Sequence, residues 1–279
     1  MKGVIALDID GTVTTRQNEI PQDVRCFLRD LVHDGWQIVF ITGRPFYSAI
    51  NCLSDLEFHP YVAAQNGSVL IDFSTKEVIE RAYLNTSLIP TMDKLCTDLP
   101  CDYLIYSGFE QKDRAYFRPH RFDEFWLNYV DARFSSFGEL CTKVDSFDEL
   151  PCESFPVVKC FGVDEAIWGL AEKIEKELGV QAPVIKDPYN HDYYVMQATH
   201  NAVNKGWALK RIIELMGWKG PVIACGDDAN DRPMLQAADW ALVMGSAPQS
   251  MHEMAHVIAP PASEMGIIEG LRKVIAQAK

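Results

Sequence analysis

Close to its start the chain carries an unbroken apolar run that ends in an acidic residue. Residues 3–7 read Gly-Val-Ile-Ala-Leu, and Asp8 follows directly. A run without alternating polar residues is typical of a strand that is buried on both faces, as in the interior of a parallel sheet. The run therefore predicts a parallel strand that ends at Asp8.

Strands and helices alternate after this first strand. A polar loop is expected at 11–19, and a helix with apolar residues at helical spacing begins near Pro21 and ends at Gly35. Further buried strands are predicted at 37–41 and 61–64, with a second helix between them. This succession indicates a doubly wound, mostly parallel α/β sheet.

The middle of the chain departs from this rhythm. From about residue 82 to residue 197 the pattern is mixed and rich in aromatic residues. Strands are predicted here at 103–106, 157–161 and 193–196, and a helix at 165–178 that ends at Gly179. We interpret this stretch as an inserted α+β domain.

The α/β pattern returns after the insert. Five elements are predicted in this part of the chain: a helix at 205–216, a strand at 221–225, a short helix after Asn230 with Pro233 in its first turn, a strand at 240–244 and a terminal helix at 267–277. The simplest organisation is a sheet domain built from residues 1–81 and 198–279, with the cap domain 82–197 inserted between them. Ligands of such sheets bind beyond the carboxyl ends of the strands.

Charge and cysteine content narrow the possible partners. The formal net charge is −13, which argues against nucleic acid because an extended phosphate backbone would be repelled. A small anionic molecule needs a local cluster of positive groups, or a bound cation, to overcome this field. The eight cysteines are scattered without CxxC or zinc-ligand spacing, which favours free thiols over disulfides.

No targeting segment is predicted. The apolar run before Asp8 is too short for a signal-peptide core, and no stretch approaches the roughly 18 apolar residues of a membrane helix. We therefore expect a soluble, cytoplasmic protein without a membrane partner, either a monomer or a small homo-oligomer.

Asp8 and Asp10 are the first candidates for chemistry. Residues two apart on an extended chain face the same side, so both carboxylates can aim at one substrate, and Gly11 allows a sharp turn after them. Two carboxylates this close repel each other unless a proton or a divalent cation intervenes. Mg²⁺ prefers such oxygen ligands. The alternative interpretation is an Asp-rich turn after a strand.

A second acidic cluster follows the strand predicted at 221–225. Residues 226–231 read Gly-Asp-Asp-Ala-Asn-Asp, which makes Asp227 and Asp231 candidate metal ligands. The alternative is a helix cap at Asn230 with acidic residues favoured by the helix dipole.

Two further signals are weaker when taken singly. Thr42, Gly43 and Arg44 follow the strand at 37–41 and offer a hydroxyl and backbone N–H groups for phosphate oxygens. Lys205 opens a helix, where the dipole mildly disfavours a cation. This placement hints that Lys205 balances the charge of a bound phosphate.

Together, in this order, the four signals resemble the haloacid dehalogenase superfamily of phosphatases. Residues 8–12 are similar to its first motif, DxDGT, and residues 226–231 to its fourth, GDxxND. Thr42 matches the second motif and Lys205 the third. The resemblance covers both ends of the chain. The insert between the second and third motifs resembles the large cap of the Cof-type, class-two group.

The resemblance implies roles in phosphoryl transfer. Asp8 would attack phosphorus and form an aspartyl-phosphate. Asp10 would protonate the leaving alcohol and then deprotonate the attacking water. Thr42, Lys205 and Asn230 would hold the phosphoryl oxygens, where charge sits in the transition state.

The resemblance also implies a magnesium site. The ligands would be the Asp8 carboxylate, the backbone carbonyl of Asp10 and the Asp227 carboxylate, with Asp231 supporting the metal through water. The implied activity is Mg²⁺-dependent hydrolysis of a small phosphorylated metabolite, such as a sugar phosphate. The substrate itself is not determined by these residues.

Details of the cap group match in part. Residues 66–68, Asn-Gly-Ser, are similar to the Asn-Gly turn that this group carries after its third strand. Residues 244–247, Met-Gly-Ser-Ala, resemble its Met-Gly-Asn-Ala segment but carry Ser246 in place of Asn.

Two rival functions remain open at this point. A sugar phosphomutase of the phosphomannomutase type shares the first motif and a similar cap, and would require a bisphosphate sugar activator. A non-catalytic module that binds a phosphate ligand would keep the fold without the chemistry. Turnover that depends on Asp8 separates that module from an enzyme.

Overall fold

The computed structural model of the chain describes residues 1–14 and 19–278 and divides into two compact units. Unit 1 comprises Met1–Arg44, Ala49–Glu80 and Asn204–Lys279, and unit 2 comprises Pro45–Ser48 and Arg81–Val203. The loop predicted at 11–19 falls partly on residues 15–18, which lie outside the described residues.

Unit 1 is built on a single sheet. Within the described residues this sheet has eight strands, in the spatial order β16 (Val257–Ala259), β15 (Trp240–Met244), β14 (Val222–Gly226), β1 (Gly3–Leu7), β2 (Trp36–Ile41), β3 (Tyr61–Ala64), β4 (Val69–Asp72) and β5 (Val78–Arg81). All neighbours from β16 to β3 pair in parallel, whereas β4 runs antiparallel to β3. Both ends of the chain therefore share one sheet, as predicted.

The central position of β1 determines where its functional residue lies. Leu7 at the end of β1 is in register with Cys225 on β14 and with Phe40 on β2. The carboxyl ends of these three strands thus meet at one edge of the sheet. Asp8 follows β1 directly at that edge, with its N–H bonded to the Cys225 carbonyl at 3.0 Å.

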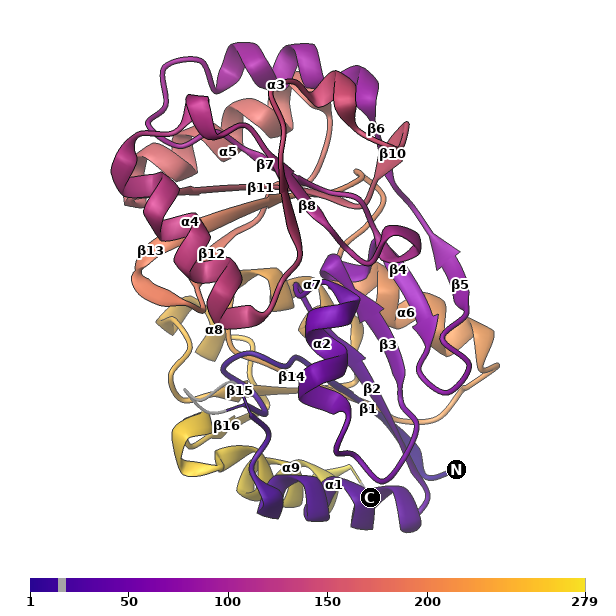
Figure 1. Cartoon of the computed structure of the whole chain (residues 1–279). Coiled ribbons are helices and arrows are strands. Elements are labelled where there is room, and N and C mark those ends of the chain that lie inside the picture. The colour runs from indigo at the N-terminus through magenta and orange to yellow at the C-terminus, as the bar shows by residue number, and fades with distance from the viewer. Residues whose placement is uncertain (15–18, 279) are drawn as a thin grey trace. The chain divides into compact units, whose positions relative to one another are not determined.

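Helices cover both faces of the sheet of unit 1, as Figure 1 shows. Val4 and Ala6 of β1 pack with α6 and α7 on one face. On the other face α1 and α9 lie side by side, with the Arg272 guanidinium 5.3 Å from the Phe27 ring centroid. The helices of this unit are α1 (Gln22–His33), α2 (Phe46–Leu53, whose first turn belongs to unit 2), α6 (Lys205–Leu215), α7 (Arg232–Ala237), α8 (Gln249–His252) and α9 (Gly266–Gln277).

Unit 2 is an α+β fold, as predicted for the insert. In the part of the chain that the structure describes, its main sheet has six strands, in the order β12 (Val184–Asp187), β13 (Asn190–Ala198), β11 (Val157–Gly162), β7 (Leu104–Tyr106), β8 (Ala115–Phe117) and β9 (Cys141–Lys143). Neighbouring strands are antiparallel except for β8 and β9. A small two-stranded sheet pairs β6 (Leu84–Asn85) with β10 (Ser154–Phe155).

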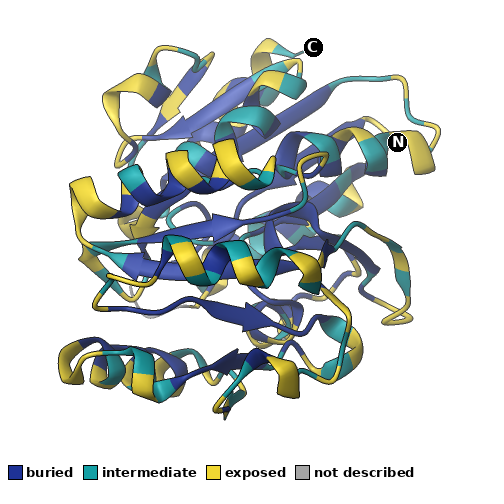
Figure 2. Cartoon of the chain, turned by 90° about the horizontal axis from the view of Figure 1, so that it is seen from above, coloured by how far each residue is buried: buried dark blue, intermediate teal, exposed yellow. Residues whose placement is uncertain are grey.

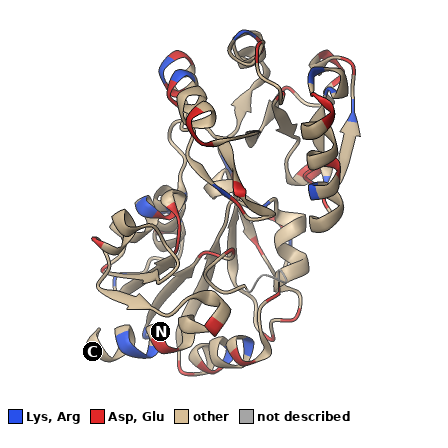
Figure 3. Ribbon diagram, turned by 90° about the vertical axis from the view of Figure 1, so that its left-hand side faces the viewer, with Lys and Arg blue, Asp and Glu red and all other residues tan. Residues whose placement is uncertain are grey.

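Two separate apolar layers cover this six-stranded sheet. Helices α3 (Ile89–Leu95) and α5 (Asp164–Leu178) pack on one face, and α4 (Glu124–Phe137) packs on the other through Trp126, Tyr129, Val130 and Phe134. Figure 2 shows the result: the inner strands β7, β8 and β11 are buried, and the helices expose one side. Most charged residues accordingly lie on helices and loops (Figure 3).

The predicted strands at 37–41, 61–64 and 221–225 are confirmed to within one residue. The predicted helix ends are also confirmed: Gly35 follows the end of α1 and Gly179 that of α5, both in left-handed conformations, with φ of 94° and 63°. Several elements of unit 2 were not predicted, because strands of three residues such as β8 leave too short a pattern. Helix α4 carries clear end signals that could have identified it. Asp123 caps it by accepting from the Trp126 N–H, and Gly138 ends it at φ 62°.

The thiol prediction is also confirmed. All eight cysteines lie in the described ranges, and none of them forms a disulfide there.

Candidate active site

Lys205 links the loop after β1 to the loop after β14, because it bonds Asp8 in the first and Asp231 in the second. It is the first residue of α6, where Asn204 caps the helix by accepting from the Trp207 N–H at 2.9 Å. Its Nζ atom lies 2.5 Å from Asp8 Oδ1 and 2.6 Å from Asp231 Oδ1. All three side chains are buried. The lysine is therefore an internal counter-charge shared by two carboxylates.

The acidic groups hold this lysine charged. Burial alone would lower the pKa of Lys205, but the charges of Asp231 and Asp8 outweigh it and leave the pKa well above its usual range. The pKa of Asp8 is raised to about 8, because burial and the Asp231 charge together exceed the opposing effect of Lys205. If Asp8 and Asp231 are both ionised, their two negative charges exceed the single positive charge of Lys205.

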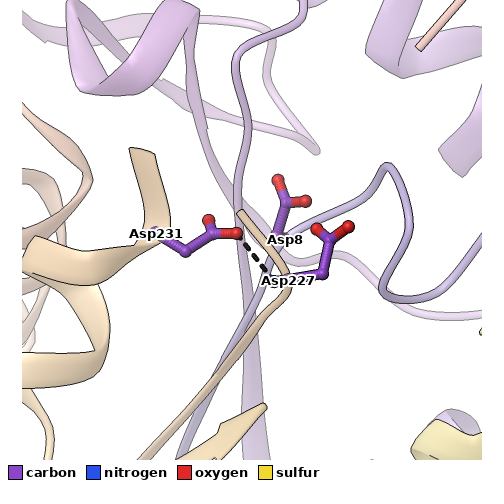
Figure 4. A group of neighbouring side chains, drawn as sticks. All are labelled: Asp8, Asp227 and Asp231. Carbon is purple, nitrogen blue, oxygen red and sulfur yellow. Dashed lines mark hydrogen bonds between the residues drawn. The ribbon is translucent and has the colours of Figure 1, made fainter. Parts of the chain in front are cut away.

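Asp231 organises the loop that follows β14. Its Oδ2 atom accepts the N–H groups of Asp227 at 2.9 Å, drawn as a dashed line in Figure 4, and of Asp228 at 3.1 Å. Since its Oδ1 binds Lys205, both oxygens of Asp231 are engaged. Asp228 caps the short turn by accepting from the Ala229 N–H. These bonds hold the Asp227 carboxylate at the edge of the sheet.

Three carboxylates converge at this edge (Figure 4). Asp8, Asp227 and Asp231 each offer an oxygen, and these three atoms lie within 4.8 Å of one another. Burial, followed by the charge of Asp8, raises the pKa of Asp227 well above its usual range. Raised pKa values of this kind mean that the cluster favours a bound cation or a proton. Acidic groups from the two ends of the chain are thus close enough to share one ion, as the sequence predicts.

Gly11 makes the approach of Asp227 possible. Its backbone is left-handed, with φ of 73°, and a Cβ atom at this position would lie 2.1 Å from Asp227 Oδ2. Only glycine combines this conformation with the space that the carboxylate needs. The DxDGT segment therefore shapes the acidic cluster as well as contributing to it.

Asp10 is held by a residue from the next loop. Arg44 donates from Nε to Asp10 Oδ2 at 2.8 Å and from Nη2 to Asp10 Oδ1 at 2.5 Å. The Arg44 N–H donates to Thr42 Oγ1 at 3.1 Å, and Gly43 lies between them in the same loop. Arg44 was predicted as a phosphate contact, and in the structure this fork of its guanidinium binds Asp10. The sequence showed both residues but not their pairing.

Asn230 and Thr42 are linked through a turn after β3. Asn230 Nδ2 donates to Asn66 Oδ1 at 3.0 Å, and the Asn66 N–H donates to the Thr42 carbonyl at 2.8 Å. The preceding N–H, of Gln65, donates to the Arg44 carbonyl at 2.9 Å. From the sequence, the Asn-Gly pair was predicted only as part of the family resemblance. Asn and Gly both tolerate a left-handed backbone, and this property could have predicted the turn independently.

All the residues predicted from the motifs thus lie along one edge of the unit 1 sheet. The arrangement joins a buried carboxylate, an acidic cluster suited to a cation, a buried lysine and a second carboxylate oriented by an arginine. This combination defines a hydrolase-type α/β enzyme that handles an anionic substrate.

Comparison with known proteins agrees with this class. The family model for haloacid dehalogenase-like hydrolases matches residues 5–271. The 5-amino-6-(5-phospho-D-ribitylamino)uracil phosphatase YcsE of Bacillus subtilis is 23% identical over 96% of this chain and 94% of its own length. The pyridoxal phosphate phosphatase YbhA of Escherichia coli is 24% identical over 91% of this chain and 92% of its own length.

A solved structure shares the fold. The HAD subclass IIB sugar phosphatase BT4131 superposes with a TM-score of 0.77 at 19% identity, over 97% of this chain and 98% of that chain. The chain belongs to the haloacid dehalogenase-like hydrolase family, and it is an enzyme of the phosphatase class. Among the described residues, no helix has both the length and the apolar character needed to cross a membrane.

Proposed function

We propose that this protein is a Mg²⁺-dependent phosphatase that hydrolyses a small phosphorylated metabolite through an aspartyl-phosphate on Asp8. The observation that carries the proposal is the convergence of Asp8, Asp227 and Asp231 within 4.8 Å, with Lys205 bonded to two of them. This arrangement combines a nucleophile with the positive charge that a phosphate ester needs in an acidic protein.

The donor set suits magnesium. Its ligands are carboxylate oxygens, which Mg²⁺ prefers, and the raised pKa values of Asp8 and Asp227 reflect a repulsion that a divalent cation removes. Because both oxygens of Asp231 already accept hydrogen bonds, Asp8 and Asp227 are the better direct ligands. The backbone carbonyl of Asp10 completes the proposed set. Bound Mg²⁺ would neutralise charge between the nucleophile and the phosphoryl oxygens.

Each remaining residue has a defined task. Asp8 attacks phosphorus, and the bond to the leaving oxygen breaks as Asp10 protonates that oxygen. Asp10 then takes a proton from the water that hydrolyses the aspartyl-phosphate. The Arg44 fork keeps the Asp10 carboxylate in one orientation for both steps. Lys205, Thr42 and Asn230 hold phosphoryl oxygens.

The proposed substrate is a phosphate monoester of a small metabolite. The names of the similar proteins support this size class, because one acts on pyridoxal phosphate and another is a sugar phosphatase. They also favour transfer of the phosphoryl group to water over its return to a sugar.

A substrate panel with variant enzymes tests the proposal. Sugar phosphates, pyridoxal phosphate and nucleotides are assayed for phosphate release with and without Mg²⁺, without any bisphosphate activator. We expect turnover by the native protein that requires Mg²⁺, a loss of at least about 10³-fold in Asp8→Asn, and a hydroxylamine-sensitive phosphoenzyme after rapid quenching.

Asp227→Asn and Asp228→Asn form a matched pair for the metal. Asp227→Asn is expected to raise the Mg²⁺ concentration for half-maximal activity by about 10–100-fold. Asp228→Asn should leave it nearly unchanged, because Asn also caps a helical turn. Full turnover in Asp8→Asn, or equal Mg²⁺ dependence in the two loop variants, would reject the proposed site.

A further inference from the structure

Gln65 stands out among the residues of the active-site edge. It follows the last residue of β3, and its side chain is completely buried, at 0% exposure. Neither Nε2 nor Oε1 has a hydrogen-bond partner among residues 1–14 and 19–278. A buried amide is normally hydrogen-bonded, since desolvation without compensation is costly.

The backbone of Gln65 adds a second, independent cost. Three successive residues have left-handed conformations: Gln65 with φ of 50°, Asn66 with 58° and Gly67 with 97°. Asn and Gly tolerate this region, but Gln does so only at an energetic cost. Strained backbone and an unsatisfied buried side chain at one position are features that folding alone does not favour, and they recur at binding sites.

Backbone contacts place Gln65 between the loops that carry the proposed phosphate contacts. Its N–H is bonded to the Arg44 carbonyl, and the adjacent Asn66 bonds the Thr42 carbonyl through its N–H and the Asn230 amide through its side chain. Asn66 and Asn230 use their side-chain amides on each other, so Gln65 is the amide residue at this junction whose side chain has no hydrogen-bond partner among the described residues. An amide N–H₂ donates to an anion without adding charge to the cluster.

We propose that Gln65 is a substrate-contacting residue whose Nε2 donates a hydrogen bond to a phosphoryl oxygen of the bound ester. The inference rests on the proposed function, because it assumes that a phosphate group binds at this edge. It adds a neutral donor to Lys205 and Thr42, and it explains why a costly residue occupies this position. The Nε2 donor of this amide is satisfied when the ligand is bound.

Gln65→Met tests the proposal through two opposite effects. Methionine has the same length and is unbranched, but it carries no polar amide. We expect the midpoint of thermal unfolding without phosphate to rise by about 2–4 °C, because the unsatisfied amide is gone. Affinity for inorganic phosphate in the presence of Mg²⁺ should fall by about 10-fold or more, and kcat/KM should fall by about 10–100-fold.

Gln37→Met is the matched control. Gln37 lies in the same unit, near the opposite end of β2 from Thr42, and its Nε2 donates to the Ile38 carbonyl at 3.1 Å. The same substitution there removes a hydrogen bond that is made in the folded protein. The unfolding midpoint should be unchanged or lower, and phosphate affinity should equal that of the native protein.

The readouts separate this inference from the proposed function. Binding of inorganic phosphate is measured by calorimetry and does not require turnover. If Gln65→Met binds phosphate as tightly as the native protein, or unfolds at a lower temperature or fails to fold, the amide serves the fold and the inference is wrong. Gln65→Glu gives a second test, since a carboxylate of the same shape should repel phosphate and lower affinity by more than 10-fold. Activity that survives Asp8→Asn would instead reject the proposed function.

Discussion

Arg44 binds the Asp10 carboxylate in a bidentate fork, with Nε at 2.8 Å from one oxygen and Nη2 at 2.5 Å from the other. The arginine side chain is 6% exposed and the aspartate side chain 26% exposed, so the pair faces solvent only on the aspartate side. A bidentate pair of this kind restricts both the position and the rotation of a carboxylate. In the proposed mechanism the Asp10 carboxyl group first donates a proton to the leaving oxygen and then accepts one from water.

Replacing the Arg44 guanidinium should therefore slow the proton-transfer steps more than it weakens substrate binding. Arg44→Lys keeps the charge but offers a single point of contact. We expect kcat to fall by about 10–100-fold with KM changed by less than about 3-fold, measured by steady-state phosphate release. If Arg44 contacted the phosphate directly, KM would rise instead. Arg29→Lys is the control, because Arg29 pairs with Glu57 at the surface of the same unit.

Gly11→Ala should weaken the metal site although it replaces none of the proposed ligands. A Cβ atom there would meet Asp227 Oδ2 at 2.1 Å, so the carboxylate must move. We expect the Mg²⁺ concentration for half-maximal activity to rise by about 10-fold or more. Gly35→Ala imposes the same left-handed strain, at φ of 94°, but meets no atom closer than 3.8 Å. Equal loss of Mg²⁺ affinity in both variants would show that backbone strain, and not contact with Asp227, is responsible.

Lys205→Met should destabilise the protein and abolish activity. It leaves Asp8 and Asp231 buried without their shared cation, and removal of one member of a buried ion pair typically costs about 3–5 kcal/mol. Urea unfolding without Mg²⁺ measures the loss. Addition of Asp231→Asn should recover part of this stability but none of the activity. A single variant as stable as the native protein would contradict the role of Lys205 as counter-charge.

Asp113 in unit 2 should give stability a distinct pH dependence. The residue is 3% exposed, and its carboxylate accepts the Tyr47 N–H at the start of α2. Burial raises its pKa from 3.8 to about 7, while backbone N–H groups oppose the shift, Glu139 adds to it and Lys159 reduces it. Since the pKa of the folded state is the higher one, the contribution of Asp113 is fully present below pH of about 4 and is lost as the pH rises to about 7.

Asp113→Asn removes this titration and keeps an acceptor for the Tyr47 N–H. Relative to the native protein, the variant should gain stability between pH of about 4 and 7, by an amount on the order of 1 kcal/mol per pH unit. Urea unfolding of both proteins at the two ends of this range measures the change. A difference that does not vary with pH would show that folding does not raise the pKa of Asp113.

Much of the fold could be predicted because its signals are local. The apolar run of β1, the strand ending at Ile41 and the glycines after α1 and α5 each act over a few residues, through periodicity or backbone freedom. Unit 2 was harder to predict. Its short strands give weak patterns, and their pairing depends on which apolar faces meet.

The candidate site also has a part that the sequence predicts and a part that only the structure reveals. The sequence by itself determined which residues are proposed to carry the chemistry, since Asp8, Asp10 and the 226–231 segment stand at strand ends in recognisable order. Only the tertiary structure decided their partners: Lys205 bonds Asp8 across 197 positions, Arg44 bonds Asp10, and Asn66 bonds Asn230. Such pairs depend on strand order and register, which arise from packing of the whole sheet, whereas motif spacing reflects only the chain next to each residue.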